Sequence, residues 1–151
     1  MTEAADRLRQ KALRLLALRD HSRAELERKL AGLGTAEEVQ ATLDRMAELG
    51  LQSDQRFAEA WLRSKSGRFG TARLKMELAR RGVDADTVAA ALAQGELDSD
   101  IERARAVWSA KFGNAAADRR EWARQARFLQ TRGFSSETIT RLLKEVPDES
   151  S

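Results

Sequence analysis

The chain has 151 residues, a formal net charge of +3 and a 34% share of charged side chains. It contains no cysteine, and a chain of this length buries roughly 70% of the surface that its unfolded form exposes, so its fold requires neither disulfides nor a metal. No run of residues has the length and apolarity of a membrane span, and the N-terminus does not resemble a signal peptide, so we expect a cytoplasmic protein.

Residues 1–50 are expected to form three helices. The first carries an apolar stripe and ends near Asp20, and the third ends at Gly50. The stripe consists of Leu8, Ala12, Leu15 and Leu16. Two residue pairs with the spacing of a capping box predict the starts of the second and third helices, Ser22 with Glu25 and Thr35 with Glu38.

Residues 51–95 are also expected to form three helices. Asp54 is the predicted cap of the first, and either Asp84 or Asp86 begins the third. Glycines are predicted to separate these helices, at Gly67, Gly70 and Gly82. The apolar positions are Phe57, Ala58, Trp61, Leu62, Leu74, Leu78, Val88 and Leu92.

Residues 96–146 are expected to form a third set of three helices, followed by a disordered tail at residues 147–151. Ser99 and Glu102 have capping-box spacing at the start of the first helix, and Ser135 caps the last. The apolar positions are Ile101, Ala104, Trp108 and Phe112, then Trp122, Ala126 and Leu129, then Ile139, Leu142 and Leu143.

The three sets share a pattern in which a leucine lies four residues before a glycine, repeated at intervals of about 50 residues. The pattern joins Leu30 to Gly34, Leu78 to Gly82 and Leu129 to Gly133. This repetition predicts an all-α fold, an elongated, curved array of three tandem three-helix repeats that resemble helix-turn-helix units. Such arrays present an extended surface rather than a closed pocket, so binding is favoured over catalysis.

Four segments carry a more specific pattern. They are Asp20 to Leu30, Asp54 to Ala58, Gly70 to Leu74 with Glu77-Leu78 and Arg81-Gly82-Val83, and Phe128-Leu129 with Arg132 to Ser135. In this order and with these separations, they resemble the RecX family of recombinase regulators over nearly the whole chain. One departure precedes Asp54, where the family usually shows an aliphatic residue and a second acid and this chain has Gln52 and Ser53.

The resemblance implies a small non-enzymatic protein that binds the RecA recombinase and lies in the groove of its filament on single-stranded DNA. It implies suppression of filament growth, ATP hydrolysis and strand exchange, and a role in DNA repair, recombination and the SOS response. Members of the family are also expected to bind DNA directly. We expect this chain to act as a monomer.

Basic side chains gather in two stretches that are separated by an acidic stretch. Helical periodicity places several of them opposite the apolar stripes of the middle helices of the second and third repeats. We therefore predict a positive stripe suited to phosphates or to an acidic groove of a protein filament. The predicted recombinase-binding or DNA-binding residues are Arg68, Arg73, Lys75, Arg80, Arg120, Arg124 and Arg127.

Alternative interpretations of these residues remain open. The chain is either a recombinase regulator, a stand-alone helical DNA-binding protein, or a helical scaffold whose charged faces are only solvated. Aromatic side chains also stack on unpaired bases, but Phe57 with Trp61 and Trp108 with Phe112 have the spacing of core residues. Phe69, in a basic loop flanked by glycines, is the one aromatic residue expected to be available for a partner or for DNA.

No catalytic constellation is present in the sequence. His21 is the single histidine, and its position before a helix cap indicates a flanking residue rather than a catalyst. The chain has no phosphate-binding glycine loop, no zinc-ligand spacing and no nucleotide fingerprint. We therefore expect no catalytic residue, no cofactor and no metal.

Overall fold

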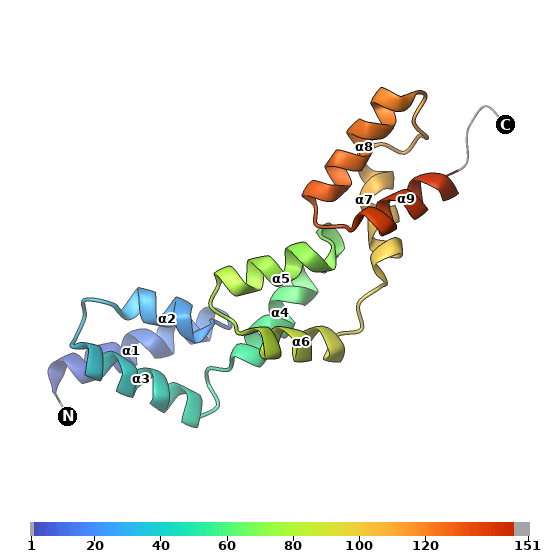
Figure 1. Cartoon of the computed structure of the whole chain (residues 1–151). Coiled ribbons are helices and arrows are strands. Elements are labelled where there is room, and N and C mark those ends of the chain that lie inside the picture. The colour runs from blue at the N-terminus through green and yellow to red at the C-terminus, as the bar shows by residue number, and fades with distance from the viewer. Residues whose placement is uncertain (1, 147–151) are drawn as a thin grey trace. The chain divides into compact units, whose positions relative to one another are not determined.

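The computed structural model describes residues 2–146, and over this range the protein is all-helical with no strand (Figure 1). The helices are α1 (Glu3–Leu18), α2 (Arg23–Leu30), α3 (Ala36–Glu48), α4 (Asp54–Lys65), the 3-10 helix η1 (Ser66–Arg68), α5 (Thr71–Arg80), α6 (Ala85–Gln94), α7 (Asp100–Lys111), α8 (Arg119–Thr131) and α9 (Ser136–Glu145). The all-α prediction, with three sets of three α-helices, is confirmed. The predicted tail at residues 147–151 lies outside the described residues.

Side-chain caps fix the starts of the early helices. Both predicted capping boxes, Ser22 with Glu25 and Thr35 with Glu38, are complete, since each N-cap side chain and each glutamate accepts a backbone N–H of the other residue. Asp84, the first of the two candidates, caps α6. These bonds satisfy N–H groups that have no partner within the helix.

The caps of the third set of three helices, which we call the third triplet, are partly as predicted. Ser99 accepts the N–H of Glu102 at 3.3 Å, but the return bond that would complete a capping box is absent between these two residues. Ser135 caps α9 as predicted, and Asp118 caps α8.

The predicted cap of α4 is wrong. Ser53 rather than Asp54 fills this role, because its Oγ accepts the N–H of Arg56 at 3.2 Å. Asp54 Oδ1 instead accepts the N–H of Arg23 at 2.8 Å and Nε2 of Gln52 at 3.0 Å. The two residues that depart from the family pattern therefore have roles here, one as a cap and one as a buried hydrogen-bond donor.

The equivalence of Gly34 with the later glycines is also wrong. The left-handed residue that ends the second helix of the first triplet is Gly32, with φ 82°, which corresponds to Gly82 at φ 84° and Gly133 at φ 93°. In all three turns the left-handed glycine lies two residues after the last helical residue, which is Leu30, Arg80 or Thr131. Gly34 instead lies against the side chain of Leu8.

The described residues divide into two compact units, and each is treated by itself. The first contains the described residues up to Trp61 together with Leu78–Gly95, and the second contains Leu62–Glu77 together with the described residues from Glu96 onward. The second triplet therefore contributes to both units. The repeat boundaries given by the sequence, 1–50, 51–95 and 96–146, stay predictions.

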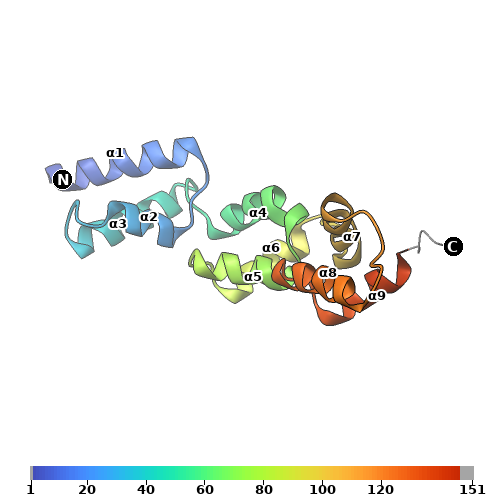
Figure 2. The same ribbon diagram turned by 90° about the horizontal axis from the view of Figure 1, so that it is seen from above.

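In the first unit, α1 and α3 lie side by side with α2 around an apolar core (Figure 2). The core residues are Leu8, Ala12, Leu26, Leu30, Val39, Leu43 and Met46. The turn after α5 packs on the start of α2, where Ser22 Oγ donates to the carbonyl of Arg81 at 2.7 Å. A Cβ on Gly82 would collide with Cβ of Ala24, so this contact requires glycine.

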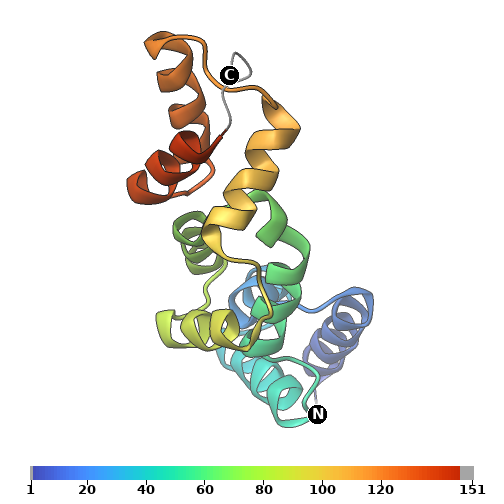
Figure 3. The same cartoon turned by 90° about the vertical axis from the view of Figure 1, so that its right-hand side faces the viewer.

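In the second unit, α7, α8 and α9 enclose a second core (Figure 3). Its buried residues are Ala104, Trp108, Leu129, Phe134, Ile139 and Leu142. Gln125 is also buried, and both ends of its amide are hydrogen-bonded. Its Oε1 accepts from Trp108 Nε1 at 2.9 Å, and its Nε2 donates to the carbonyl of Asn114 at 3.1 Å. A buried amide with both ends hydrogen-bonded avoids the cost of desolvating an unpaired polar group.

A second glycine contact closes this unit. The N–H of Gly70 donates to the carbonyl of Arg132 at 2.8 Å, and a Cβ on Gly70 would collide with the carbonyl oxygen of Gly133. A Cβ on Gly133 would in turn collide with Cβ of Arg73 and lie 2.6 Å from its backbone nitrogen. The repeated glycine of the sequence is therefore the point at which the turn of one triplet meets the middle helix of the preceding triplet.

His21 is buried, with 2% of its surface exposed, although its sequence position indicated a flanking residue. Its Nδ1 lies 3.0 Å from the carbonyl of Arg19 and its Nε2 lies 2.9 Å from Nζ of Lys29. A neutral imidazole satisfies both contacts by donating from Nδ1 and accepting at Nε2. Burial lowers the pKa of His21, and the nearby charges of Arg19 and Lys29 lower it further, against the opposing effect of the bond to the Arg19 carbonyl.

The low pKa of His21 predicts a pH-dependent stability. The unfolded chain binds a proton at this histidine near its ordinary pKa of about 6.5, whereas the folded chain resists it, so the free energy of unfolding falls as pH is lowered below about 6.5. Urea unfolding at intervals between pH 7 and pH 5 measures this slope. The variant His21→Gln, in a chain with no other histidine, is expected to be less stable but to show a flatter slope. Equal slopes for both proteins would contradict this account.

Candidate functional site

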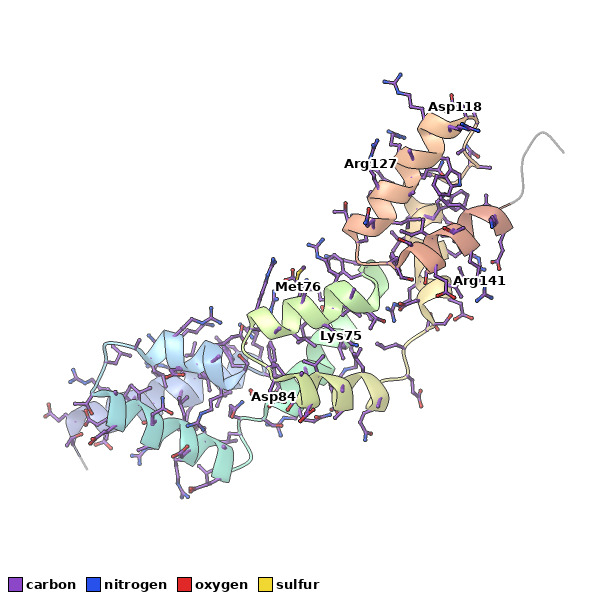
Figure 4. The ribbon with its side chains drawn as sticks, in the orientation of Figure 1. Lys75, Met76, Asp84, Asp118, Arg127 and Arg141 are labelled. Atoms are coloured by element: carbon purple, nitrogen blue, oxygen red, sulfur yellow. The ribbon has the colours of Figure 1, made fainter. Side chains whose placement is uncertain are left out.

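The three predicted arginines of α8 are exposed. Arg120, Arg124 and Arg127 face away from the core, and Arg127 projects from the side of α8 that lies opposite α9 (Figure 4). Arg124 pairs with Glu121 at 3.1 Å, whereas Arg120 and Arg127 form no ion pair with a described residue. The outward placement of these side chains is as predicted, and their role in binding remains a prediction.

The remaining predicted cations come from η1 and α5. Arg68 and Lys75 are exposed and form no ion pair within residues 2–146, and Lys75 lies beside the exposed Met76 on α5 (Figure 4). Arg80 is exposed at the end of α5 and belongs to the first unit. The other six predicted residues all belong to the second unit.

Arg73 differs from the prediction, because it is a packing residue as well as a cation. Only 30% of its side chain is exposed. Its Nη1 donates to the carbonyl of Thr131 at 2.8 Å, its Nε lies 3.6 Å from Glu77, and its guanidinium lies 4.6 Å from the ring centre of Phe69. This side chain therefore fastens α5 to the end of α8.

Trp122 also differs from the prediction, since it is 40% exposed rather than buried in the stripe of α8. The buried positions of this helix are Gln125 and Leu129. A prediction from hydrophobicity alone places the apolar stripe of α8 wrongly, because the hydrogen-bonded Gln125 occupies a core position. The apolar face is rotated accordingly, and Trp122 lies at its edge.

A series of contacts between cations and aromatic rings runs through the second unit. The sequence did not predict these contacts. The guanidinium of Arg132 lies 5.8 Å from the ring centre of Phe69 and 5.0 Å from that of Phe128, so it links the two rings. Phe128 meets Phe112 edge to face at 5.4 Å. We call the whole set the cation–aromatic ladder, and its members are Phe69, Arg73, Lys111, Phe112, Arg124, Phe128 and Arg132.

Two cations of the ladder keep their charge uncompensated. Arg132 and Nζ of Lys111 lie over the ring of Phe128, and neither forms an ion pair with a described residue. Elsewhere in this unit, by contrast, Arg105 and Arg141 both bind Glu145, at 3.0 Å and 3.2 Å. The hydrogen bonds from Arg141 and then Arg105 hold the pKa of Glu145 below its usual range. Cations without a carboxylate partner in this unit therefore include Arg132 and Lys111 of the ladder, Arg120 and Arg127 of α8, and Arg68 and Lys75.

The site predicted from the sequence did not include Lys111, Phe112, Phe128 or Arg132. The signal available in the sequence was the interleaving of phenylalanine with lysine and arginine in the same stretches, but core spacing dominated the interpretation of Phe112. Phe57 and Trp108 are buried as predicted, while Phe112 is only partly buried.

Neither a metal site nor a membrane span is seen in the described part of the chain. Residues 2–146 contain no group of three or more acidic or histidine side chains arranged to hold an ion. Over the same residues, no helix combines the length and apolarity needed to span a bilayer. The groups that do converge are cations and aromatic rings, so the geometry supports binding to an anionic partner.

The fold is that of an all-helical protein made of three-helix domains. The comparisons with known proteins agree in detail. The models of the first, second and third three-helix domains of RecX match residues 9–46, 53–92 and 98–143. The chain belongs to the RecX family of regulatory proteins.

Curated relatives and solved structures support this assignment. The chain is 43% identical to the regulatory protein RecX of Leptothrix cholodnii, over 91% of this chain and 87% of the relative. It is 42% identical to that of Chromobacterium violaceum, over 94% and 92%. The crystal structure of RecX from Lactobacillus salivarius has the same fold, with a TM-score of 0.80 at 20% identity, covering 96% of this chain and 97% of that one.

Proposed function

We propose that this chain is a cytoplasmic regulator that binds the RecA recombinase and its filament on single-stranded DNA, and that it inhibits filament extension, ATP hydrolysis and strand exchange without a catalytic step of its own. Membership of a regulatory family supports this proposal. The structural observation that carries it is the exposed, unpaired positive charge of Arg120 and Arg127 on α8, in the same unit as Arg68 and Lys75.

The proposed mechanism is occupation of a surface that the filament needs. A filament on single-stranded DNA carries the charge of its phosphates, and a cationic face is drawn to such a polyanion with a salt-dependent affinity. A chain seated on the filament blocks the addition of further subunits and the exchange of strands. The recombinase then turns over less ATP, because fewer of its subunits are assembled on the DNA.

Titrating the chain into recombinase on single-stranded DNA tests the proposal, with ATP hydrolysis as the readout. We expect hydrolysis to fall as the chain is added. Inhibition well below one chain per recombinase subunit would indicate binding at filament ends, and inhibition near stoichiometry would indicate binding along the filament. Unchanged hydrolysis at saturating chain would refute the proposal.

The salt dependence of inhibition distinguishes the proposed regulator from the alternative, a stand-alone DNA-binding protein. The same titration is repeated at a salt concentration at which the chain alone no longer binds bare single-stranded DNA. Inhibition that persists indicates direct contact with the recombinase. Inhibition that disappears together with DNA binding favours the alternative.

A further inference from the structure

Trp122 on α8 is placed unlike the other two tryptophans of the chain. Trp108 is 6% exposed, and its indole N–H donates to Gln125 at 2.9 Å. Trp61 is partly buried, and the guanidinium of Arg81 lies 5.0 Å from its ring centre. Trp122 is 40% exposed, and no cation of the described residues lies over its ring. Its ring is therefore the tryptophan surface that is open to a partner.

The neighbours of Trp122 toward the outer side of α8 are small. Residues three or four positions apart on a helix lie next to one another, so Ala126 adjoins Trp122, and Ala123 adjoins Ala126. Both alanines are partly exposed. Because an alanine side chain ends at Cβ, neither neighbour keeps an approaching surface away from the exposed part of the ring.

Cations without a carboxylate partner border this apolar area. Arg119 lies three residues before Trp122, and Arg127 lies four residues after Ala123. Both arginines are exposed and form no ion pair with a described residue. The single carboxylate of α8, Glu121, is partly buried and pairs with another arginine of the helix at 3.1 Å. We call the set the tryptophan face, and its members are Arg119, Trp122, Ala123, Ala126 and Arg127.

We infer that the tryptophan face docks on a protein surface, with the ring of Trp122 seated in an apolar pocket and with Arg119 and Arg127 against carboxylates at the edge of that pocket. The inference rests on the proposed function, because it takes the recombinase subunit as the partner that carries the pocket. Tryptophan and arginine are enriched among the residues that dominate protein–protein binding energy. An apolar centre with a polar rim is also the usual composition of such interfaces.

Two other occupants fit this face less well. In a twofold contact the same residues meet from both copies of the chain, which brings the uncompensated arginines of both copies together. A nucleic-acid strand satisfies the arginines through its phosphates but places charged oxygens beside the alanines, which offer them no hydrogen bond. An acidic protein surface with an apolar pocket satisfies all five residues of the tryptophan face.

The test measures binding of the full chain to recombinase in the absence of DNA, by biolayer interferometry. Trp122→Ala is expected to weaken binding by about thirtyfold or more, as the loss of a central anchor does. Trp122→Phe keeps an aromatic side chain and should weaken binding by less than about fivefold. The loss from Trp122→Ala should be the same at low and high salt, because salt does not screen apolar burial. The loss from Arg127→Gln should shrink as salt is raised.

A second variant leaves the ring in place. Ala123→Gln adds a larger side chain beside Trp122 and is expected to weaken binding by about tenfold, because it obstructs the close approach of the partner. Glutamine is a good helix former, so α8 should persist, and circular dichroism confirms that every variant is folded. Leu18→Ala truncates a leucine of the first unit that is 82% exposed, and as the matched control it should bind like the unaltered chain.

Binding of oligothymidylate by the same variants separates a protein contact from base stacking. Trp122→Ala should retain the affinity of the unaltered chain for oligothymidylate, because it removes no cation. A comparable loss for oligothymidylate and for recombinase would assign the ring to nucleic acid and overturn the inference. A dimer of the unaltered chain that Trp122→Ala dissociates, measured by sedimentation, would also overturn it. So would normal recombinase binding by folded Trp122→Ala and Ala123→Gln, or an equal loss from Leu18→Ala.

ATP hydrolysis by recombinase on single-stranded DNA, measured in parallel, keeps this inference separate from the proposed function. If the unaltered chain inhibits hydrolysis and Trp122→Ala inhibits it at the same concentrations, the inference alone fails. If the unaltered chain neither binds recombinase nor inhibits hydrolysis, the proposed function fails and the inference fails with it.

Discussion

Replacing Gly133 with alanine is expected to lower the free energy of unfolding by about 3 kcal/mol or more. Two costs add. The residue has φ 93°, a left-handed conformation that costs an L-residue about 1–2 kcal/mol. The new Cβ would also collide with Arg73, whose backbone nitrogen would lie 2.6 Å away, so α5 and the turn after α8 would have to separate. Urea unfolding followed by circular dichroism measures the loss.

Two other glycines provide controls for the separate costs. Gly32 has φ 82° but open space where its Cβ would lie, so Gly32→Ala should cost only about 1–2 kcal/mol. Gly67 has neither a positive φ nor a neighbour within reach, so Gly67→Ala should change stability by less than about 1 kcal/mol. Equal losses for Gly133→Ala and Gly32→Ala would show that the glycine contact does not hold the second unit together.

Reversing the three arginines of α8 to glutamate is expected to weaken recombinase inhibition by roughly a hundredfold or more. Each reversal removes a cation and adds an anion facing a polyanionic partner, and each is expected to cost at least about 1 kcal/mol. The variant carries Arg120→Glu, Arg124→Glu and Arg127→Glu. All three side chains are exposed, so the change should leave the core intact. Inhibition of ATP hydrolysis on single-stranded DNA gives the midpoint concentration for comparison.

A variant with the same change of net charge on the first unit is the control. Arg7, Arg14 and Arg28 are exposed, and their reversal alters the overall charge equally without touching α8. This variant should retain much more inhibition than the α8 variant. Equal loss in both variants would mean that net charge, and not the face of α8, governs the interaction.

Much of the fold followed from local sequence rules. Capping boxes such as Ser22 with Glu25 need only residues three positions apart, and amphipathic stripes need only helical periodicity, so both could be predicted. What failed depended on partners distant in the chain. Local sequence predicts a cap at Asp54, because it does not show that this side chain accepts a hydrogen bond from the distant Arg23. Local sequence likewise predicts a flanking role for His21, because the residues that bury it are distant in the chain.

The candidate site was less predictable than the fold. Outward-facing cations on α8 could be inferred from periodicity, because a long charged side chain opposite a core stripe has only solvent to face. The engagement of Arg73 could not, since it depends on the carbonyl of Thr131 on another helix. The ladder could not either, because its contacts join η1, α7 and α8, and no spacing rule relates residues in different elements.

Site-specific crosslinking tests most directly whether α8 contacts the filament. The chain has no cysteine, so Arg127→Cys and Arg14→Cys each introduce a single site for a photoactivatable crosslinker. With recombinase assembled on single-stranded DNA, we expect crosslinks to the filament from position 127 and few from position 14. Crosslinks from position 14 with none from position 127 would contradict the assignment of the binding surface to α8.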